Sequence, residues 1–233
     1  MSILRSIDQG FDLFIGTIRY LLGDPNAWER SIRKMEARSR ISPPAQGGIV
    51  FTGSSSFTLW STLEQDMAPL PAINRGFGGA LMGDVVRYAD RIILPYAPKA
   101  VVLFAGTNDI SGRKPASAQQ VADGFDAFTA KIWATLPDTL IFFVAITPSR
   151  ARWALWPIAS EANRLIHETV RVDPRLRFID FTDRLLGADG LPDRTLYRSD
   201  KLHPSKQGYV LWTSAIKTAL ESEPSILAAH SSI

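Results

Sequence analysis

Cysteine is absent from the 233 residues of this sequence, and histidine is scarce. Without cysteine there can be no disulfide bond, no catalytic thiolate and no cysteine-ligated zinc or iron–sulfur site. No two of the three histidines, His167, His203 and His230, have the helical or hairpin spacing of a metal site. We therefore expect no metal ion, and only these three side chains could supply a histidine general base.

An excess of charge of one sign and an uninterrupted apolar run are also lacking. Lys and Arg number 26 against 23 for Asp and Glu, a difference too small to indicate nucleic-acid binding. Asp8, Asp12 and Arg19 interrupt the apolar stretch at residues 3–22, so no transmembrane span is predicted. The amino-terminal end is not clearly basic and no small-residue cleavage site follows it. We therefore predict no signal peptide and expect a cytoplasmic protein.

Phosphate-binding motifs are missing as well. The sequence has no Gly-x4-Gly-Lys loop, and Gly76-Phe77-Gly78-Gly79 lacks the third glycine of a dinucleotide fingerprint. We therefore expect no cofactor.

Residues 1–24 are predicted to form an amphipathic helical extension, and residues 25–233 a single domain. Apolar residues recur at spacings of three and four, which places them on one helical face; they are Ile3, Leu4, Ile7, Phe11, Phe14, Ile15, Ile18, Leu21 and Leu22. This face either packs on its own domain or contacts a second copy of the chain or a membrane surface.

Short apolar runs alternate with helical segments along the rest of the chain. The predicted strands cover residues 49–52, 70–74, 100–104, 140–146 and 175–181. Such alternation indicates a parallel sheet with right-handed crossovers and helices on both faces. We therefore predict a three-layer α/β/α fold with a five-stranded parallel sheet, similar to flavodoxin. One helix is predicted over residues 56–67.

The turns after the strands carry the residues of chemical interest, because ligands bind at the carboxyl ends of strands in such sheets. Gly53 lets the chain turn sharply after the first strand, and Ser55 follows it. A serine placed there could act as a nucleophile, although a serine after a strand can equally be the N-cap of the next helix.

Asp200 and His203 stand three residues apart in a segment that leads into the last helix. The carboxylate could accept the imidazole N–H, fix its tautomer and stabilise its protonated form. The alternative is a capping aspartate beside a surface histidine. For an oxyanion, the backbone N–H groups of Ser55 and Gly79 and the side-chain amide of Asn108 could serve as donors, although asparagine is also a common turn residue.

These segments together resemble the SGNH (GDSL-type) hydrolase superfamily of esterases, lipases and related deacylases. Four blocks match in order over roughly residues 45–220: Ile49 to Ser55, Asn74 to Gly79, Gly106 to Asp109, and Asp200 to His203. The resemblance implies that Ser55 is the nucleophile, His203 the base and Asp200 its partner. It also implies an oxyanion hole formed by Ser55, Gly79 and Asn108.

The match departs from the family at Ser54, where the family most often has aspartate. We favour Ser55 over Ser54 and Ser56 as the nucleophile because it lies two residues after Gly53 and five before Trp60, as the family's serine does. An α/β-hydrolase elbow does not fit, because Phe57 stands where that motif needs glycine.

The predicted loop at residues 147–157 follows a central strand and should overhang the site. Arg150, Trp153 and Trp156 are candidates for the substrate pocket, with ordinary loop packing as the alternative. Tryptophan would suit an acyl chain or a sugar face, and Arg150 or Arg152 could hold an anionic group. We predict a carboxylic ester hydrolase acting on short-chain acyl or acetyl esters. An acyltransferase or a carbohydrate deacetylase could use the same residues, and a carbohydrate-binding protein could share the fold without catalysis.

Overall fold

A parallel sheet of five strands forms the centre of the computed structural model, which describes residues 14–24 and 26–227. The strand order is β2-β1-β3-β4-β5, the doubly wound order of flavodoxin-like proteins. The strands are β1 (Ile49–Gly53), β2 (Ala72–Gly76), β3 (Ala100–Phe104), β4 (Leu140–Val144) and β5 (Leu176–Ile179). The predicted three-layer α/β/α fold with a five-stranded parallel sheet is confirmed.

The strands are apolar because both faces of the sheet are covered. In β3, Val101 and Leu103 belong to the hydrophobic cluster on one face, and Val102 and Phe104 to the cluster on the other. This alternation follows from the two-residue period of a strand.

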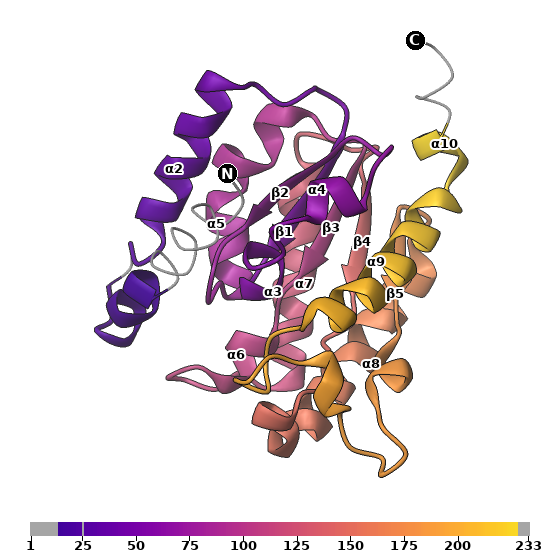
Figure 1. Cartoon of the computed structure of the whole chain (residues 1–233). Helices are drawn as coiled ribbons and strands as arrows, with labels where there is room; N and C mark the ends of the chain where they lie inside the picture. The colour runs from indigo at the N-terminus through magenta and orange to yellow at the C-terminus, as the bar shows by residue number, and fades with distance from the viewer. Residues whose placement is uncertain (1–13, 25, 228–233) are drawn as a thin grey trace.

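Helices cover the two faces as separate layers (Figure 1). On one face lie α5 (Met82–Ile92), α7 (Ala118–Trp133) and α8 (Trp156–Val172), with α2 (Glu29–Ile41) packed outside α5. The other face is covered by α3 (Ser55–Thr58), α4 (Leu63–Asp66), α9 (Lys206–Glu221) and α10 (Pro224–Leu227). The short helix α6 (Thr107–Ser111) follows β3 directly.

Two local predictions were wrong. Residues 56–67 form two short helices, α3 and α4, because the Asn74 amide takes up carbonyls that a continuous helix would use. Its Nδ2 donates to the Phe57 oxygen at 2.6 Å and to the Trp60 oxygen at 3.4 Å. The loop predicted at residues 147–157 contains the 3₁₀ helix η2 (Arg150–Leu155), and α8 begins at Trp156. Pro157 is compatible with that start, since the first helical turn needs no N–H donor there.

The predicted amino-terminal helix is described from residue 14 onward, and residues 3–13 lie outside the described residues. Residues 14–21 are helical, and Tyr20 stacks on Trp28 with ring centroids 6.4 Å apart. The apolar side chains on the opposite side of this helix are 39–80% exposed; they are Phe14, Ile18, Leu21 and Leu22. Packing on the chain's own domain is therefore wrong for these four residues, and contact with a second copy or a membrane stays a prediction. Within the described ranges, no helix is both long and apolar enough to cross a bilayer.

Candidate active site

The strand order brings three of the predicted turns together. Because β1 lies between β2 and β3 in a parallel sheet, the segments that follow these strands emerge side by side at one edge. Figure 1 shows α3 and α6 at this end of the sheet. The site therefore forms at the carboxyl ends of the strands, as expected for a doubly wound fold.

Ser55 is held by the turn at the end of β1. Gly53 has φ of +130°, and a Cβ there would lie 2.0 Å from the Phe104 carbonyl oxygen, so only glycine fits without a shift of the backbone. The next N–H, that of Ser54, donates to the same oxygen at 2.9 Å. Helix α3 then begins at Ser55, which is 9% exposed.

A chain of hydrogen bonds links Ser55, His203 and Asp200. The Ser55 Oγ lies 2.8 Å from His203 Nε2, and His203 Nδ1 lies 2.7 Å from Asp200 Oδ2. The segment that carries His203 and Asp200 is 148 residues from Ser55 in the chain. The structure thus brings together the three residues that the motifs predicted, from the start of α3 and from the segment before α9.

Asp200 is kept ionised by its partners. Burial raises its pKa, but hydrogen bonds from the His203 side chain and from the backbone N–H groups of His203 and Leu202 outweigh burial and lower it below the usual value. An ionised carboxylate can only accept, so it selects the tautomer of His203 with the proton on Nδ1. Nε2 is then free to accept the Ser55 hydroxyl proton.

Two of the predicted oxyanion donors are available to a ligand. Among the residues that the structure describes, the backbone N–H groups of Ser55 and Gly79 have no acceptor. The Asn108 Nδ2 donates one hydrogen bond of 3.1 Å to the Ala80 oxygen, and an amide nitrogen has a second hydrogen to give. The three groups lie on the three adjacent segments that follow β1, β2 and β3.

Gly79 is fixed by Trp28, a residue that the sequence analysis did not single out. Gly79 has φ of +71°, and a Cβ there would lie 2.5 Å from the Trp28 ring. Trp28 is 2% exposed, and its indole N–H donates to Asp84 Oδ2 at 3.1 Å. The same oxygen accepts the Leu81 N–H at 3.0 Å, so the residues after Gly79 are tied to this cluster.

A second partly buried carboxylate, Asp109, ties the third block to the second. Its two oxygens accept the Met82 N–H at 3.0 and 3.2 Å, at the start of α5. Burial raises the pKa of Asp109 to about 6 and also raises that of Asp84. Only the position of Asp109 next to Asn108 could have indicated this role from the sequence.

Arg152 reaches the site from η2. Its guanidinium donates to Asn108 Oδ1 at 3.0 Å, to the Thr107 carbonyl oxygen at 3.0 Å and to the Thr107 Oγ1 at 2.8 Å. The sequence indicated an arginine in this loop for a substrate anion, but gave no sign of contact with Asn108.

The other predicted pocket residues, Arg150, Trp153 and Trp156, have different contacts from those of Arg152. Arg150 donates to the Pro192 oxygen at 2.6 Å and pairs with Asp189 at 3.0 Å. Trp153 and Trp156 stack with centroids 6.3 Å apart, and both are partly exposed. Neither tryptophan has a hydrogen bond within the described residues that ties it to Ser55 or His203, so their role in a pocket stays a prediction.

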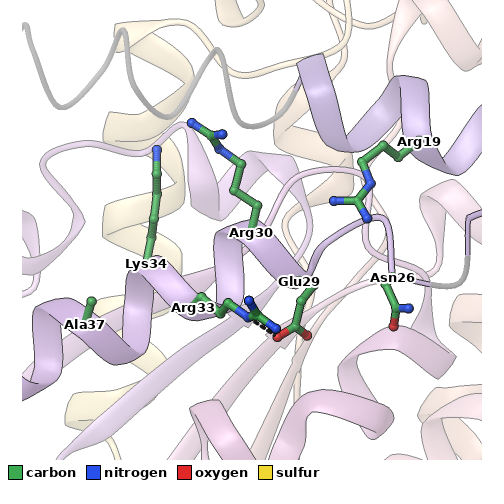
Figure 2. A pocket seen from close by; sticks show the side chains of 7 residues that line it. All are labelled: Arg19, Asn26, Glu29, Arg30, Arg33, Lys34 and Ala37. Atoms are coloured by element: carbon green, nitrogen blue, oxygen red, sulfur yellow. Dashed lines mark hydrogen bonds and ion pairs between the residues drawn. The ribbon is translucent and has the colours of Figure 1, made fainter.

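A basic hollow lies elsewhere on the molecule, between the helix at residues 14–21 and α2. Figure 2 shows it, with a volume of about 720 Å³; it is lined by Arg19, Asn26, Glu29, Arg30, Arg33, Lys34 and Ala37. Ser55, His203 and Asp200 do not line this hollow. In the described ranges, no group of three His, Asp or Glu side chains is placed to hold a metal ion.

Fold and site define an α/β/α protein with a serine, a histidine and an aspartate at the carboxyl edge of its sheet. The GDSL-like Lipase/Acylhydrolase family matches residues 45–211, more than half of the chain, and the chain belongs to this family. This confirms the resemblance found in the sequence. None of the curated proteins compared with the chain matches it.

Solved structures share the fold at low sequence identity. A candidate platelet activating factor from Streptococcus pneumonia is 19% identical, with a TM-score of 0.73, over 87% of this chain and 97% of that one. A GDSL-like lipase from Bacteroides thetaiotaomicron is 16% identical, with a TM-score of 0.66, over 82% and 97%. A variant of Axe2, an acetyl-xylooligosaccharide esterase from Geobacillus Stearmophilus, is 14% identical, with a TM-score of 0.57, over 74% and 94%.

Proposed function

We propose that the chain is a serine hydrolase that cleaves carboxylic esters through Ser55, His203 and Asp200. The observation that carries the proposal is the pair of short hydrogen bonds that joins the three side chains. A hydroxyl is a weak nucleophile on its own, and an imidazole within hydrogen-bond reach activates it. Membership of an acylhydrolase family supports the same chemistry.

In the proposed first step, Ser55 Oγ attacks the ester carbonyl carbon while His203 Nε2 takes the hydroxyl proton. The carbonyl oxygen becomes an oxyanion, which accepts hydrogen bonds from the N–H groups of Ser55 and Gly79 and from the Asn108 amide. His203 then gives its proton to the leaving alkoxide as the carbon–oxygen bond breaks. An acyl group remains esterified to Ser55.

In the second step, a water molecule attacks the acyl group and His203 takes its proton. The oxyanion forms again at the same donors and collapses to release the acid, and the Ser55 oxygen regains a proton from His203. Asp200 holds the imidazole through both steps and stabilises its protonated form, because the carboxylate stays charged.

The substrates proposed are short-chain acyl or acetyl esters. Axe2, which shares the fold, is an acetyl-xylooligosaccharide esterase. The stacked, partly exposed pair Trp153 and Trp156 would suit the face of a sugar. A carbohydrate deacetylase is therefore the second candidate within the same chemistry.

The test is hydrolysis of a p-nitrophenyl ester series from short to long acyl chains, with the Ser55→Ala variant beside the wild type. We expect kcat to fall by about 10⁴-fold or more in this variant. Ser54→Ala and Ser56→Ala are matched controls, and both should keep kcat within a few-fold. Equal activity in Ser55→Ala would show that the proposed nucleophile is wrong.

The same assay separates the alternatives. Acetylated xylooligosaccharides test the deacetylase, and an added alcohol acceptor tests the acyltransferase by the ratio of transfer to hydrolysis. Absence of activity on every ester and acceptor would favour a carbohydrate-binding protein that keeps the fold without catalysis.

A further inference from the structure

Arg152 fixes which way the Asn108 amide faces. A guanidinium has only donors, so the amide group that meets it at 3.0 Å must be the oxygen. The amide nitrogen then points away from Arg152, and it donates to the carbonyl oxygen of Ala80, the residue after Gly79. The contact with Arg152 therefore selects the orientation in which Asn108 presents N–H groups to the oxyanion position.

The guanidinium is itself held firmly. Two of its hydrogen bonds go to Thr107, one to the carbonyl oxygen and one to the hydroxyl. The backbone around Arg152 is hydrogen-bonded too. The Arg152 N–H donates to the Ser149 oxygen, and the N–H of the preceding residue, Ala151, donates to the Lys201 oxygen. Lys201 lies between Asp200 and His203, so one segment contacts both the loop of the base and the oxyanion amide.

The positive charge of Arg152 is not neutralised by an ion pair with any carboxylate of residues 14–24 or 26–227. Burial lowers its pKa, but arginine stays protonated in proteins. A cation that accepts electron density from the amide oxygen makes the amide N–H a stronger donor, since linked hydrogen bonds polarise one another.

We infer that Arg152 is a positioning residue that orients and polarises the Asn108 amide toward the oxyanion, a role that rests on the proposed ester hydrolysis. The oxyanion exists only in the transition state and the tetrahedral intermediate. Loss of Arg152 therefore lowers kcat and leaves KM nearly unchanged. If Arg152 were merely structural, its loss would lower stability without a specific fall in kcat at unchanged KM.

The test is a double-mutant cycle between Arg152→Met and Asn108→Ala, with kcat and KM measured on the best p-nitrophenyl ester. We expect Asn108→Ala to lower kcat by about 10²- to 10³-fold, as removal of one oxyanion donor does. Arg152→Met should lower kcat by about 10-fold or more with KM within about twofold. In the double variant, kcat should equal that of Asn108→Ala within about threefold, because Arg152 acts through this amide.

Arg150→Met is the matched control for coupling. Arg150 lies in the same 3₁₀ helix but contacts Asp189 and Pro192, so any effect of its loss should multiply with that of Asn108→Ala. Arg152→Lys keeps the positive charge but lacks the planar set of donors of the guanidinium. Its kcat should therefore lie between those of Arg152→Met and the wild type, which a general folding defect would not produce. Thermal unfolding of each variant identifies those that fail to fold, and only folded variants enter the cycle.

Two outcomes would overturn the inference: multiplicative effects of Arg152→Met and Asn108→Ala, or a kcat for Arg152→Met equal to that of the wild type. The Ser55→Ala variant separates this failure from failure of the proposed function. If Ser55→Ala is inactive and the cycle is multiplicative, only the role of Arg152 is wrong. If Ser55→Ala keeps its activity, the esterase mechanism itself is wrong.

Discussion

Two regions of the molecule meet at Gly79 and contribute to the site in different ways. The segments that follow β1, β2 and β3 and the segment between β5 and α9 carry the groups of the proposed mechanism, and all of them lie within the residues matched by the family. The segment around Trp28 precedes that match, yet its indole packs on Gly79. The strand ends thus bring the reactive groups together, whereas packing from an unmatched segment fixes the backbone of Gly79, one of the proposed oxyanion donors.

After Ser55→Ala, the largest effect is expected in the same region, from Asp200→Asn. The variant keeps the shape of the side chain but removes the negative charge that stabilises protonated His203, so we expect kcat to fall by about 10³-fold or more. The measurement is kcat on the preferred p-nitrophenyl ester. Asp193→Asn is the control, because Asp193 caps the 3₁₀ helix η4 (Arg194–Leu196) and has no contact with His203. A fall below tenfold for Asp200→Asn would contradict its assigned role.

The contact between the two regions is tested by Gly79→Ala. The added Cβ would stand 2.5 Å from Trp28, and left-handed backbone costs a residue other than glycine about 1–2 kcal/mol. We expect kcat to fall by about 10-fold or more and the free energy of unfolding to fall by about 2 kcal/mol. Both quantities are measured, the second by urea titration.

Gly83→Ala is the matched control for this substitution. A Cβ at Gly83 would meet nothing within 4 Å, and the residue lies in α5, where alanine stabilises a helix by about 1 kcal/mol over glycine. It should keep kcat and raise stability slightly. If Gly79→Ala behaves in the same way, packing of Trp28 does not fix the turn at Gly79.

Asp109, the partly buried carboxylate that links the second and third blocks, gives a pH-dependent effect on stability rather than on kcat. Burial raises the pKa of Asp109 to about 6, above its usual value of 3.8, so the folded state holds this proton more tightly than the unfolded chain. Its contribution to stability is therefore fully present below about pH 4 and is lost as the pH rises through about 6. The loss is on the order of 3 kcal/mol.

Asp109→Asn removes this titration and keeps one oxygen that can accept the Met82 N–H. We expect the free energy of unfolding of the variant to change less than that of the wild type between about pH 4 and about pH 7. Urea titrations at these two pH values measure the difference. An equal change in the free energy of unfolding for the two proteins would show that the pKa of Asp109 is not raised by folding.

The sequence predicted those features that are encoded in short stretches. Apolar runs predicted the five strands, and the four motif blocks predicted which residues meet at Ser55. The roles of Trp28 and Arg152 depend on contacts between residues 56 and 44 positions apart in the chain, which no local pattern encodes. The break between α3 and α4 has the same origin, because it depends on an amide of β2 at Asn74.

The smallest effect on catalysis is expected from the outer side of the helix at residues 14–21. Leu21→Ser with Leu22→Ser removes apolar surface that the chain itself does not cover, since these side chains are 56% and 80% exposed. The opposite side, which packs on Trp28 through Tyr20, is unchanged, so kcat on a water-soluble ester should stay within about twofold. The change should instead lower the mass in solution, if the partner is a second copy, or the binding to vesicles that contain an anionic phospholipid. Light scattering and co-sedimentation measure the two. If neither changes, this side of the helix has no partner of either kind.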